Sequence, residues 1–212
     1  MGPIKVMLVD DHAVVRMGFK LLLAACEDIE VIGEADSGEV AYQRYTELKP
    51  DVIVMDLSMP GMGGIEAVRR LTARDKGVRI LALSAHEDTA HPKRVLKAGA
   101  TGYLSKRGAP EALIDAVRTV AAGRMYLDAE IAQKLAMQDV TGTQNPVEAL
   151  SEREFEVFIH LARGQSVNQI AETLHLSTST VGTHLYNVKQ KLGASNQAEL
   201  TLIALRNGLI EA

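Results

Sequence analysis

Apolar residues follow two different spacings along the chain and divide it into an N-terminal and a C-terminal part. In residues 1–123, short runs of Val, Ile, Leu and Met alternate with stretches in which apolar residues recur every three or four positions. A short unbroken apolar run is typical of a strand buried on both faces of a parallel sheet, and the longer spacing is typical of an amphipathic helix. The alternation predicts an α/β domain with a doubly wound, five-stranded parallel sheet.

The five strands are expected at residues 5–10, 30–35, 51–56, 79–84 and 101–106. The helices expected around them include residues 13–25, 38–48 and about 110–121. Gly99 and Gly123 follow predicted helices, where a residue without Cβ easily adopts the left-handed conformation that ends a helix. These local signals agree with the strand–helix alternation.

The C-terminal part, residues 150–212, carries helical signals only. Ser151 and Glu154 form a capping box between apolar Leu150 and Phe155, so a first helix is expected to begin near residue 152. Further helix-start and helix-end signals are Gly164, Ser166 with Gln169, Ser177, Gly193 and Asn207. They predict four helices, the last at about 196–207. Residues 124–149 between the two parts are expected to hold a short helix and a flexible linker at about 138–148.

Polar residues end four of the expected strands: Asp10 with Asp11, Asp56, Ser84 and Lys106. Because ligands bind beyond the carboxyl ends of parallel strands, these residues are expected to converge. Three carboxylates in one crevice repel one another and favour a hard cation with oxygen ligands. The sequence therefore predicts a Mg²⁺ site.

Asp56 is the expected nucleophile of this site. A carboxylate that attacks phosphorus forms an acyl phosphate, and Mg²⁺ together with Lys106 would neutralise the phosphoryl oxygens. Ser84 is expected to donate a hydrogen bond to one of them. The pattern predicts a phosphate-accepting carboxylate.

Two other classes of protein share parts of this pattern. Haloacid-dehalogenase-like phosphatases also form an aspartyl phosphate, but their nucleophile lies in an Asp-x-Asp motif on the first strand, whereas here position 58 is Ser. A dinucleotide-binding sheet would need a Gly-rich turn after the first strand, and residues 8–15 contain no Gly. Both alternatives are disfavoured.

The composition is that of a globular protein without a membrane segment. The chain has 212 residues and is 47% hydrophobic and 24% charged, enough for one large or two small domains. Cys26 is the only cysteine and lies in an apolar stretch, which excludes an intrachain disulfide. No apolar run approaches the roughly 20 residues of a membrane span, and Asp10 and Asp11 interrupt any signal peptide. A cytoplasmic location is expected.

Four motifs in the N-terminal part carry a resemblance to a known family. They are VDDH at 9–12, MDLSMPGMGG at 55–64, LSAHED at 83–88 and AGATGYLSK at 98–106. In this order they resemble a response-regulator receiver domain. The whole chain resembles the NarL/FixJ subfamily, with a receiver domain at 1–123, a linker at 124–149 and a LuxR-type helix-turn-helix domain at 150–212.

The resemblance implies a two-component response regulator. A sensor histidine kinase would phosphorylate Asp56, and the regulator would catalyse only its own phosphorylation and dephosphorylation. Mg²⁺ would be held by Asp10, Asp11, Asp56 and the backbone carbonyl of Ser58. Lys106 and Ser84 would contact the acyl phosphate, and Ser84 and Tyr103 would act as the switch. The alternative for Tyr103 is a half-buried strand aromatic with its hydroxyl in water.

The C-terminal motif, residues 164–192, resembles the LuxR-type helix-turn-helix, whose third helix enters the major groove of double-stranded DNA. The helix N-terminus at Ser177, Thr178, Ser179 and Thr180 is expected to bind a phosphate, unless these residues serve only as a cap. Groove contacts are expected from Thr183, Tyr186 and Lys189. The remaining candidate DNA contacts on this helix are His184, Asn187 and Lys191.

The charge of the C-terminal part complicates DNA binding. Residues 147–212 contain five basic and seven acidic residues, and Gly182 stands where the family typically has a DNA-contacting Lys. An alternative is therefore a phosphorylation-controlled regulator that binds proteins and has weak or no autonomous DNA affinity. The last helix has more apolar positions than one buried face requires. It could form the interface of a homodimer in the phosphorylated state, or it could be a fully packed terminal helix.

Overall fold

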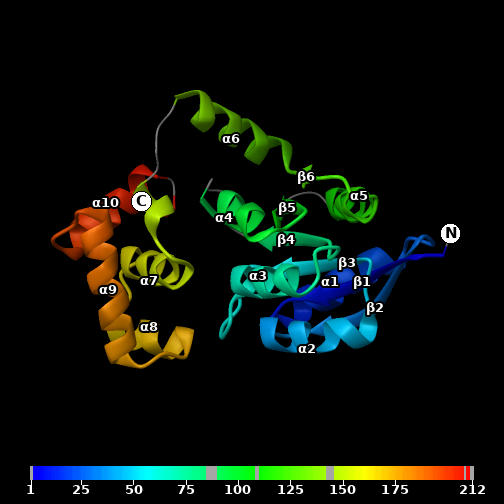
Figure 1. Ribbon diagram of the computed structural model, residues 1–212, viewed down its shortest axis with the longest axis horizontal. Helices are drawn as coiled ribbons and strands as arrows, with labels where there is room; N and C mark the ends of the chain where they lie inside the picture. Colours follow the sequence, from blue (N-terminus) through cyan, green and yellow to red (C-terminus); the bar gives the residue numbers. More distant parts are fainter. Residues whose placement is uncertain (1, 85–89, 108–109, 142–145, 208, 211–212) are drawn as a thin grey trace. The chain divides into compact units, whose positions relative to one another are not determined.

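The computed structural model describes residues 2–84, 90–107, 110–141, 146–207 and 209–210, and the chain divides into two compact units (Figure 1). Of the described residues, the larger unit contains 2–84 and 91–132, and the smaller unit contains Ala90 and the residues from Gln133 onward. Each unit has its own cluster of buried hydrophobic side chains.

The larger unit is built on a parallel sheet. Its strands are β1 (Ile4–Val9), β2 (Ile29–Ala35), β3 (Val52–Asp56), β4 (Ile80–Ser84), β5 (Gly102–Ser105) and β6 (Tyr126–Leu127). Their order across the sheet is β2-β1-β3-β4-β5-β6, and every neighbouring pair is parallel. The doubly wound parallel sheet expected from the sequence is confirmed, with the two-residue strand β6 added at one edge.

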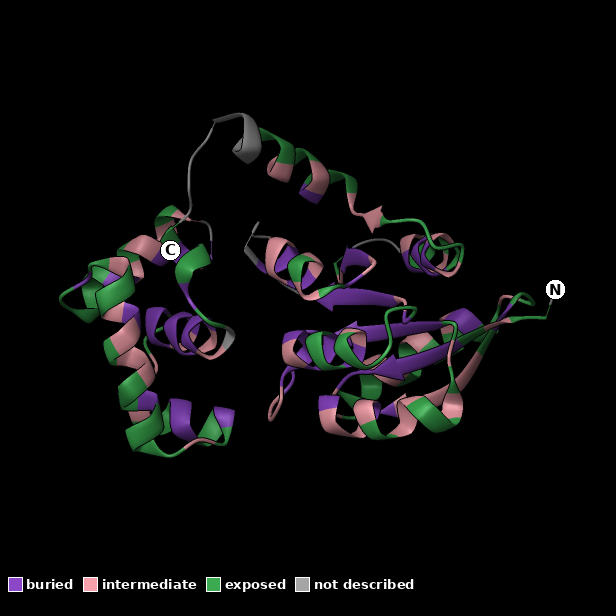
Figure 2. Ribbon diagram, in the orientation of Figure 1, coloured by how far each residue is buried: buried purple, intermediate pink, exposed green. Residues whose placement is uncertain are grey.

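Helices cover both faces of the sheet. They are α1 (Ala13–Ala24), α2 (Gly38–Leu48), α3 (Gly64–Arg74), α4 (Ala90–Ala98) and α5 (Pro110–Ala121). Leu23 of α1 and Leu113 of α5 belong to one buried cluster with Leu8, Val54 and other strand residues, so α1 and α5 share a face. The strand residues that point to the other face, such as Met7 and Ile53, are buried as well, and the central strands β3 and β4 are buried along their whole length (Figure 2). Burial on both faces explains the unbroken apolar runs in the sequence.

The strand β6 lies in the segment that the sequence analysis assigns to the linker. Its amide groups bond to the edge of β5, since Tyr126 N donates to Thr101 O at 3.3 Å and Asp128 N donates to Tyr103 O at 3.2 Å. A helix α6 (Ala129–Thr141) follows, and it is longer than the short helix expected there. Part of the expected linker is therefore attached to the sheet. Residues 142–145 lie outside the described part of the chain, and a 3-10 turn, η1 (Pro146–Ala149), follows them.

The smaller unit contains α7 (Glu152–Ala162), α8 (Val167–Leu174), α9 (Thr178–Leu192) and α10 (Gln197–Arg206). The capping boxes predicted at Ser151 and Ser166 are both present, and Ser177 caps α9. The chain has positive φ at Gly164 and Gly193, as expected for residues that end helices. The helix boundaries predicted from these residues are confirmed.

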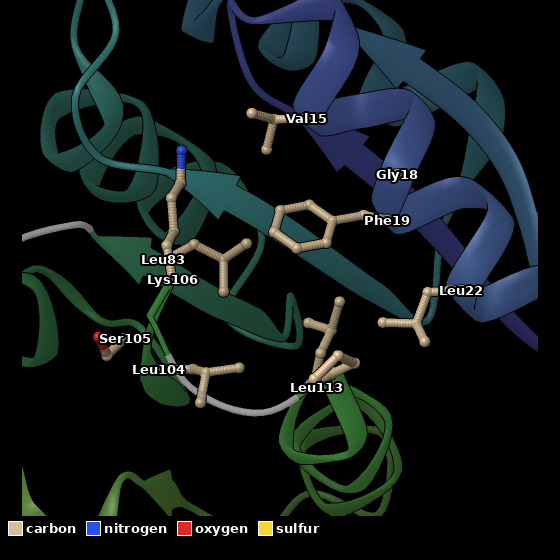
Figure 3. Close-up of a pocket in the computed structure, with 10 residues that line it drawn as sticks. Val15, Gly18, Phe19, Leu22, Leu83, Leu104, Ser105, Lys106 and Leu113 are labelled. Carbon is tan, nitrogen blue, oxygen red and sulfur yellow. The ribbon is translucent and has the colours of Figure 1, made fainter.

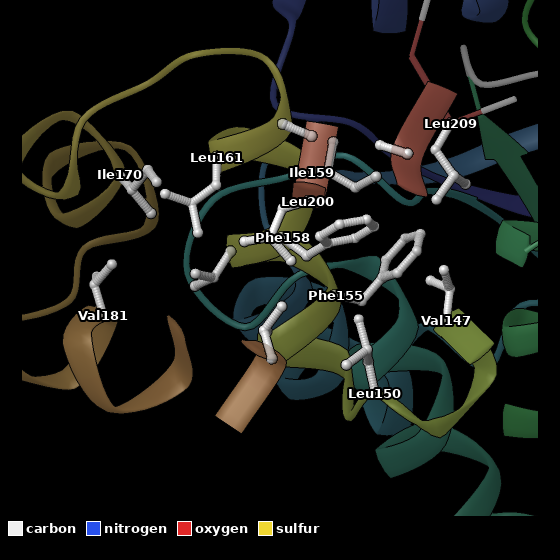
Figure 4. Close-up of a cluster of buried hydrophobic side chains, with 14 of the residues drawn as sticks. Val147, Leu150, Phe155, Phe158, Ile159, Leu161, Ile170, Val181, Leu200 and Leu209 are labelled. Carbon is white, nitrogen blue, oxygen red and sulfur yellow. The ribbon is translucent and has the colours of Figure 1, made fainter. Parts of the chain in front are cut away.

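The core of the smaller unit lies between its helices (Figure 4). Phe155 and Phe158 of α7 are almost fully buried, and their ring centroids are 6.5 Å apart. Ile170 of α8, Val181 of α9 and Leu200 of α10 belong to the same cluster. Burial of these side chains fixes which face of α9 points outward.

Candidate functional site

The strand ends bring four of the predicted site residues to one edge of the sheet. Asp10 follows β1, Asp56 ends β3, Ser84 ends β4 and Lys106 follows β5. These strands are consecutive neighbours in the sheet. Lys106 N donates to Ser84 O at 2.8 Å, which aligns the last two strand ends. The convergence expected from the parallel topology is therefore observed.

Lys106 connects the two buried carboxylates. Its Nζ lies 2.7 Å from Asp10 Oδ2 and 2.9 Å from Asp56 Oδ2. Asp56 Oδ1 accepts a hydrogen bond from Ser58 N at 3.1 Å, and Asp10 Oδ1 accepts one from His12 N at 2.8 Å. One oxygen of each carboxylate is thus held by the backbone, and the other faces the ammonium group.

Burial changes the ionisation of this pair. Only 1% of Asp56 is exposed, and burial raises the pKa of its carboxyl, while Lys106 opposes that rise. Burial alone would lower the pKa of Lys106, but the Asp56 charge and the hydrogen bond to Asp10 outweigh it and hold the pKa above its usual value. Lys106 therefore stays charged, and Asp56 is a more basic carboxylate than an exposed aspartate.

The acidic residues form a group with the spacing of a metal site. Ligand atoms from Asp10, Asp11, His12 and Asp56 all lie within 4.8 Å of one another. Asp11 Oδ1 is buried and has no hydrogen-bond donor aligned with it among the described residues. A buried carboxylate oxygen without a donor is costly unless a cation satisfies it, so the residues fit a divalent cation. Ser58 contributes a backbone N–H to Asp56 in this structure.

Two residues of this site were missed by the sequence analysis. His12 belongs to the group of possible ligands, although only its place directly after Asp11 indicates this. Gly64, the first residue of α3, lies against the backbone of Asp56. A Cβ at this position would lie 2.1 Å from Asp56 O and 2.5 Å from Leu57 Cα. The pair Gly63-Gly64 in the MPGMGG motif is the signal that could have identified this close approach.

Tyr103 lies in β5 and is fully buried. The alternative of a half-buried ring with its hydroxyl in water is therefore wrong. Its backbone pairs with Ala82 of β4 on one side and with Leu127 of β6 on the other. Tyr103 is thus held between the strand that carries Ser84 and the segment that leads into α6.

An apolar cavity of about 550 Å³ lies beside the site, between α1 and α5 (Figure 3). Phe19 and Leu22 of α1, Leu104 of β5 and Leu113 of α5 line it, and the Lys106 side chain runs along one end. A Cβ at Gly18 of α1 would meet no atom within 4 Å. The absence of a side chain at Gly18 therefore helps to leave this space open.

The predicted DNA-contact residues lie on α9. Ser177 Oγ accepts a hydrogen bond from Thr180 N at 3.1 Å, so it serves as the N-cap. Thr178, Ser179 and Thr180 are exposed in the first turn. Thr183 is also exposed, and 64% of Tyr186 is exposed, although a tyrosine side chain is largely apolar. His184 and Asn187 are partly buried.

Both lysines of α9 have partners within their own unit. Lys189 Nζ donates to Ser195 O at 3.2 Å, and Lys191 Nζ lies 2.6 Å from Glu154 Oε2. Glu154 is buried and is also the third residue of the α7 capping box. Lys191 therefore balances a buried carboxylate, a role that the sequence analysis did not anticipate.

The last helix, α10, exposes one large apolar side chain. Leu202 is 45% exposed, whereas Leu200 and Ala204 are buried in the core.

Among the residues that the structure describes, no helix is long and apolar enough to cross a membrane.

Comparisons with known proteins match both parts of the chain. Residues 6–118 match the response regulator receiver domain, and residues 148–204 match the bacterial regulatory proteins of the luxR family. Response regulator UvrY of Escherichia coli (strain K12) is 41% identical over 211 residues, covering 99% of this chain and 97% of UvrY. Response regulator GacA of Pseudomonas syringae pv. syringae (strain B728a) is 40% identical over 211 residues, covering 99% of each chain.

A solved structure shows the same architecture. RcsB from Salmonella enterica serovar Typhimurium, bound to promoter rprA in the presence of phosphomimetic BeF3-, is 26% identical. The match covers 95% of this chain and 98% of that chain, with a TM-score of 0.69.

Proposed function

Because the chain belongs to the response regulators that join a receiver domain to a LuxR-type DNA-binding domain, we propose that phosphorylation of Asp56 controls its binding to promoter DNA. Members of this family are regulators, so the phosphatase and dinucleotide-binding alternatives are set aside. The observation that carries the proposal is the position of Lys106 Nζ, within 2.9 Å of both Asp10 and Asp56. From this position the Lys106 ammonium group can contact a phosphoryl group that is bonded to Asp56.

The proposed reaction begins with attack of an Asp56 oxygen on the phosphorus of a phosphorylated sensor histidine kinase. The bond from phosphorus to the kinase imidazole breaks as the bond to Asp56 forms. Asp56 is prepared for this step because burial makes its carboxylate more basic, and the Ser58 N–H holds one of its oxygens in place. The Lys106 ammonium group would then pair with the negatively charged phosphoryl oxygens instead of the Asp56 carboxylate.

Asp10, Asp11 and Asp56 would hold Mg²⁺ in this state, with the Ser58 carbonyl as a further ligand. When bound, the ion neutralises charge on the phosphoryl oxygens. The buried Asp11 oxygen without a donor supports this assignment. Ser84, at the end of β4, would donate its hydroxyl to the phosphoryl group. Tyr103 would change its conformation on phosphorylation and thereby alter the contacts of β6, the strand paired with β5.

In the smaller unit, α9 would enter the major groove. Thr183 and Tyr186 are exposed and would make groove contacts together with Lys189. The exposed first turn at Thr178–Thr180 would bind a phosphate through backbone N–H groups. A homodimer of the phosphorylated protein would double these contacts, with Leu202 of α10 at its interface. The promoter-bound RcsB structure supports the binding of this chain to promoter DNA.

The test of this function is selection from a random duplex DNA library at fixed salt concentration. Wild type treated with acetyl phosphate is compared with Asp56→Ala treated in the same way. A DNA motif enriched only by the phosphorylated wild type is the expected result. Enrichment of the same motif by both proteins would show that phosphorylation does not control DNA binding. Enrichment by neither would favour a regulator that binds proteins instead of DNA.

The groove assignment predicts a defined loss of affinity. Thr183→Ala, Tyr186→Ala and Lys189→Ala should each weaken binding to the selected DNA, by about 1–3 kcal/mol where a base contact is lost. Gln190→Ala is the matched control, because Gln190 is also exposed on α9 but is not assigned a contact. Fluorescence anisotropy on a labelled duplex measures the affinities. Equal affinities for all four variants and wild type would show that another surface binds DNA.

A further inference from the structure

The imidazole of His12 faces the carboxylates of the phosphorylation site. Its Nδ1 lies 2.9 Å from Asp11 Oδ1 and 3.3 Å from Asp10 Oδ1. Two ligands at right angles around an octahedral ion, each bonded at about 2.1 Å, are about 3 Å apart. The distance from the nitrogen to each of the two oxygens is therefore that expected between neighbouring ligands of one metal ion.

The imidazole has no other structural role that the described residues reveal. His12 is the N-cap residue of α1, but its side chain makes no capping hydrogen bond. The backbone N–H of His12 binds Asp10 Oδ1 instead, and 65% of the side chain is exposed. Asp11 Oδ1 still has no aligned donor, so the imidazole does not satisfy it.

The nature of the donors decides which ion such a site prefers. Carboxylate and carbonyl oxygens suit Mg²⁺, whereas an imidazole nitrogen suits divalent transition ions such as Ni²⁺ and Zn²⁺. Three carboxylates alone offer only oxygen ligands, which suit Mg²⁺ and Mn²⁺. The addition of one nitrogen changes this balance.

We propose that His12 is a metal ligand that makes the phosphorylation site bind divalent first-row transition ions more tightly than Mg²⁺. The proposal rests on the Mg²⁺ site of the proposed function, because Asp10, Asp11 and Asp56 are shared by both ions. The two classes of ion therefore exclude each other. A transition ion held by His12 occupies the carboxylates that Mg²⁺-dependent phosphorylation requires.

Isothermal titration calorimetry of the full chain with Mg²⁺ and with Ni²⁺ tests the proposal. Asn is a favourable N-cap residue, so His12→Asn should leave α1 folded, which circular dichroism verifies. This variant should lose roughly tenfold or more of the Ni²⁺ affinity, by analogy with the loss caused by removing supporting groups of metal sites. Its Mg²⁺ affinity should stay within about twofold of wild type, because water can replace the imidazole on Mg²⁺.

The matched control is His175→Asn. His175 is exposed and has a left-handed backbone conformation that Asn tolerates, and it lies outside the group of possible ligands. Excess Mg²⁺ should displace Ni²⁺ from wild type. The proposal is overturned if His12→Asn leaves Ni²⁺ affinity unchanged, if it weakens both ions equally, or if Mg²⁺ cannot displace Ni²⁺.

Titration of an Asp11→Asn variant with Mg²⁺ shows whether a negative result refutes only the role of His12 or also the Mg²⁺ site of the proposed function. If Asp11→Asn weakens Mg²⁺ binding while His12→Asn does not affect Ni²⁺, the Mg²⁺ site stands and only the role of His12 fails. If wild type binds no Mg²⁺, or Asp11→Asn leaves Mg²⁺ binding intact, the metal site of the proposed function fails as well.

Discussion

Asp56 lies in an environment that disfavours the ionised form of its carboxyl group. The carboxyl is buried at the end of β3, and among the described residues the Lys106 ammonium and the Ser58 N–H offset the loss of water. Burial is the largest influence and raises its pKa. A group whose pKa is raised on folding adds stability below its unfolded pKa and loses it as the pH rises. At neutral pH the ionised Asp56 therefore destabilises the fold.

Asp56→Asn should accordingly raise the melting temperature at pH 7. The amide keeps the size of the side chain and removes the buried charge. The gain should shrink as the pH falls toward 3.8, the ordinary pKa of the carboxyl, because the wild-type side chain then becomes neutral as well. Thermal denaturation in metal-free buffer from pH 8 to pH 5 measures this. A lower melting temperature for the variant at pH 7 would show that the ion pair with Lys106 outweighs burial.

Lys191 shows that a charge on the proposed DNA-contact helix can serve the fold instead. Lys191→Met keeps the aliphatic stem but leaves Glu154 without its ammonium partner, so we expect a loss of about 1 kcal/mol in the free energy of unfolding of the smaller unit. Urea denaturation measures the loss, with the exposed neighbour variant Gln190→Met as the control. Unchanged stability together with weaker DNA binding would instead assign Lys191 to the DNA interface.

At the scale of single elements, a glycine destabilises a helix when it lies inside it and stabilises the helix when it lies at its C-terminal end. Gly18 lies inside α1 and Gly182 inside α9, and a Cβ at either position would meet no atom within 4 Å. Both weaken their helices, because Gly loses more backbone freedom on folding than Ala. Gly193 ends α9 with φ +64, a conformation that disfavours any residue with a Cβ.

Gly18→Ala and Gly182→Ala should therefore each stabilise the protein by about 0.5–1 kcal/mol. The same change at Gly193 should destabilise it, which makes Gly193→Ala the matched control. Chemical denaturation of the three variants measures the differences. Destabilisation by Gly182→Ala would mean that the close surroundings of α9 differ from those described.

At the scale of the whole molecule, the two units have separate hydrophobic cores. One core lies around the sheet and contains Leu8, Val54 and Leu113, and the other lies between the four C-terminal helices around Phe155 and Phe158. Separate cores favour separate cooperative unfolding, and a ligand raises the stability only of the unit that binds it.

Differential scanning calorimetry should therefore resolve two transitions. Mg²⁺ at about 100 times its Kd should stabilise the unit with the sheet by about 2.7 kcal/mol and leave the other transition in place. Asp11→Asn should abolish that shift, since Asp11 is a proposed ligand. A single transition, or an equal shift of both, would show that the units unfold together.

Much of the local structure could be predicted from the sequence, because its causes lie within a few residues of each other. The capping boxes at Ser151 and Ser166 define where α7 and α8 begin, and the strand runs that end at Asp56 and Ser84 define β3 and β4. The strand β6 could not be predicted in this way. It has two residues, and it forms because Tyr126 N and Asp128 N find acceptors at Thr101 O, directly before β5, and at Tyr103 O in β5.

The sequence by itself determined the alternation of strands and helices, the caps of the C-terminal helices and the polar residues at the strand ends. Each follows from the side chains of near neighbours. Only the tertiary structure decided that Lys106 bridges Asp10 and Asp56, that Tyr103 is fully buried and that Lys191 neutralises Glu154. These contacts join residues far apart in the chain, and burial, which sets their strength, exists only after the chain has folded.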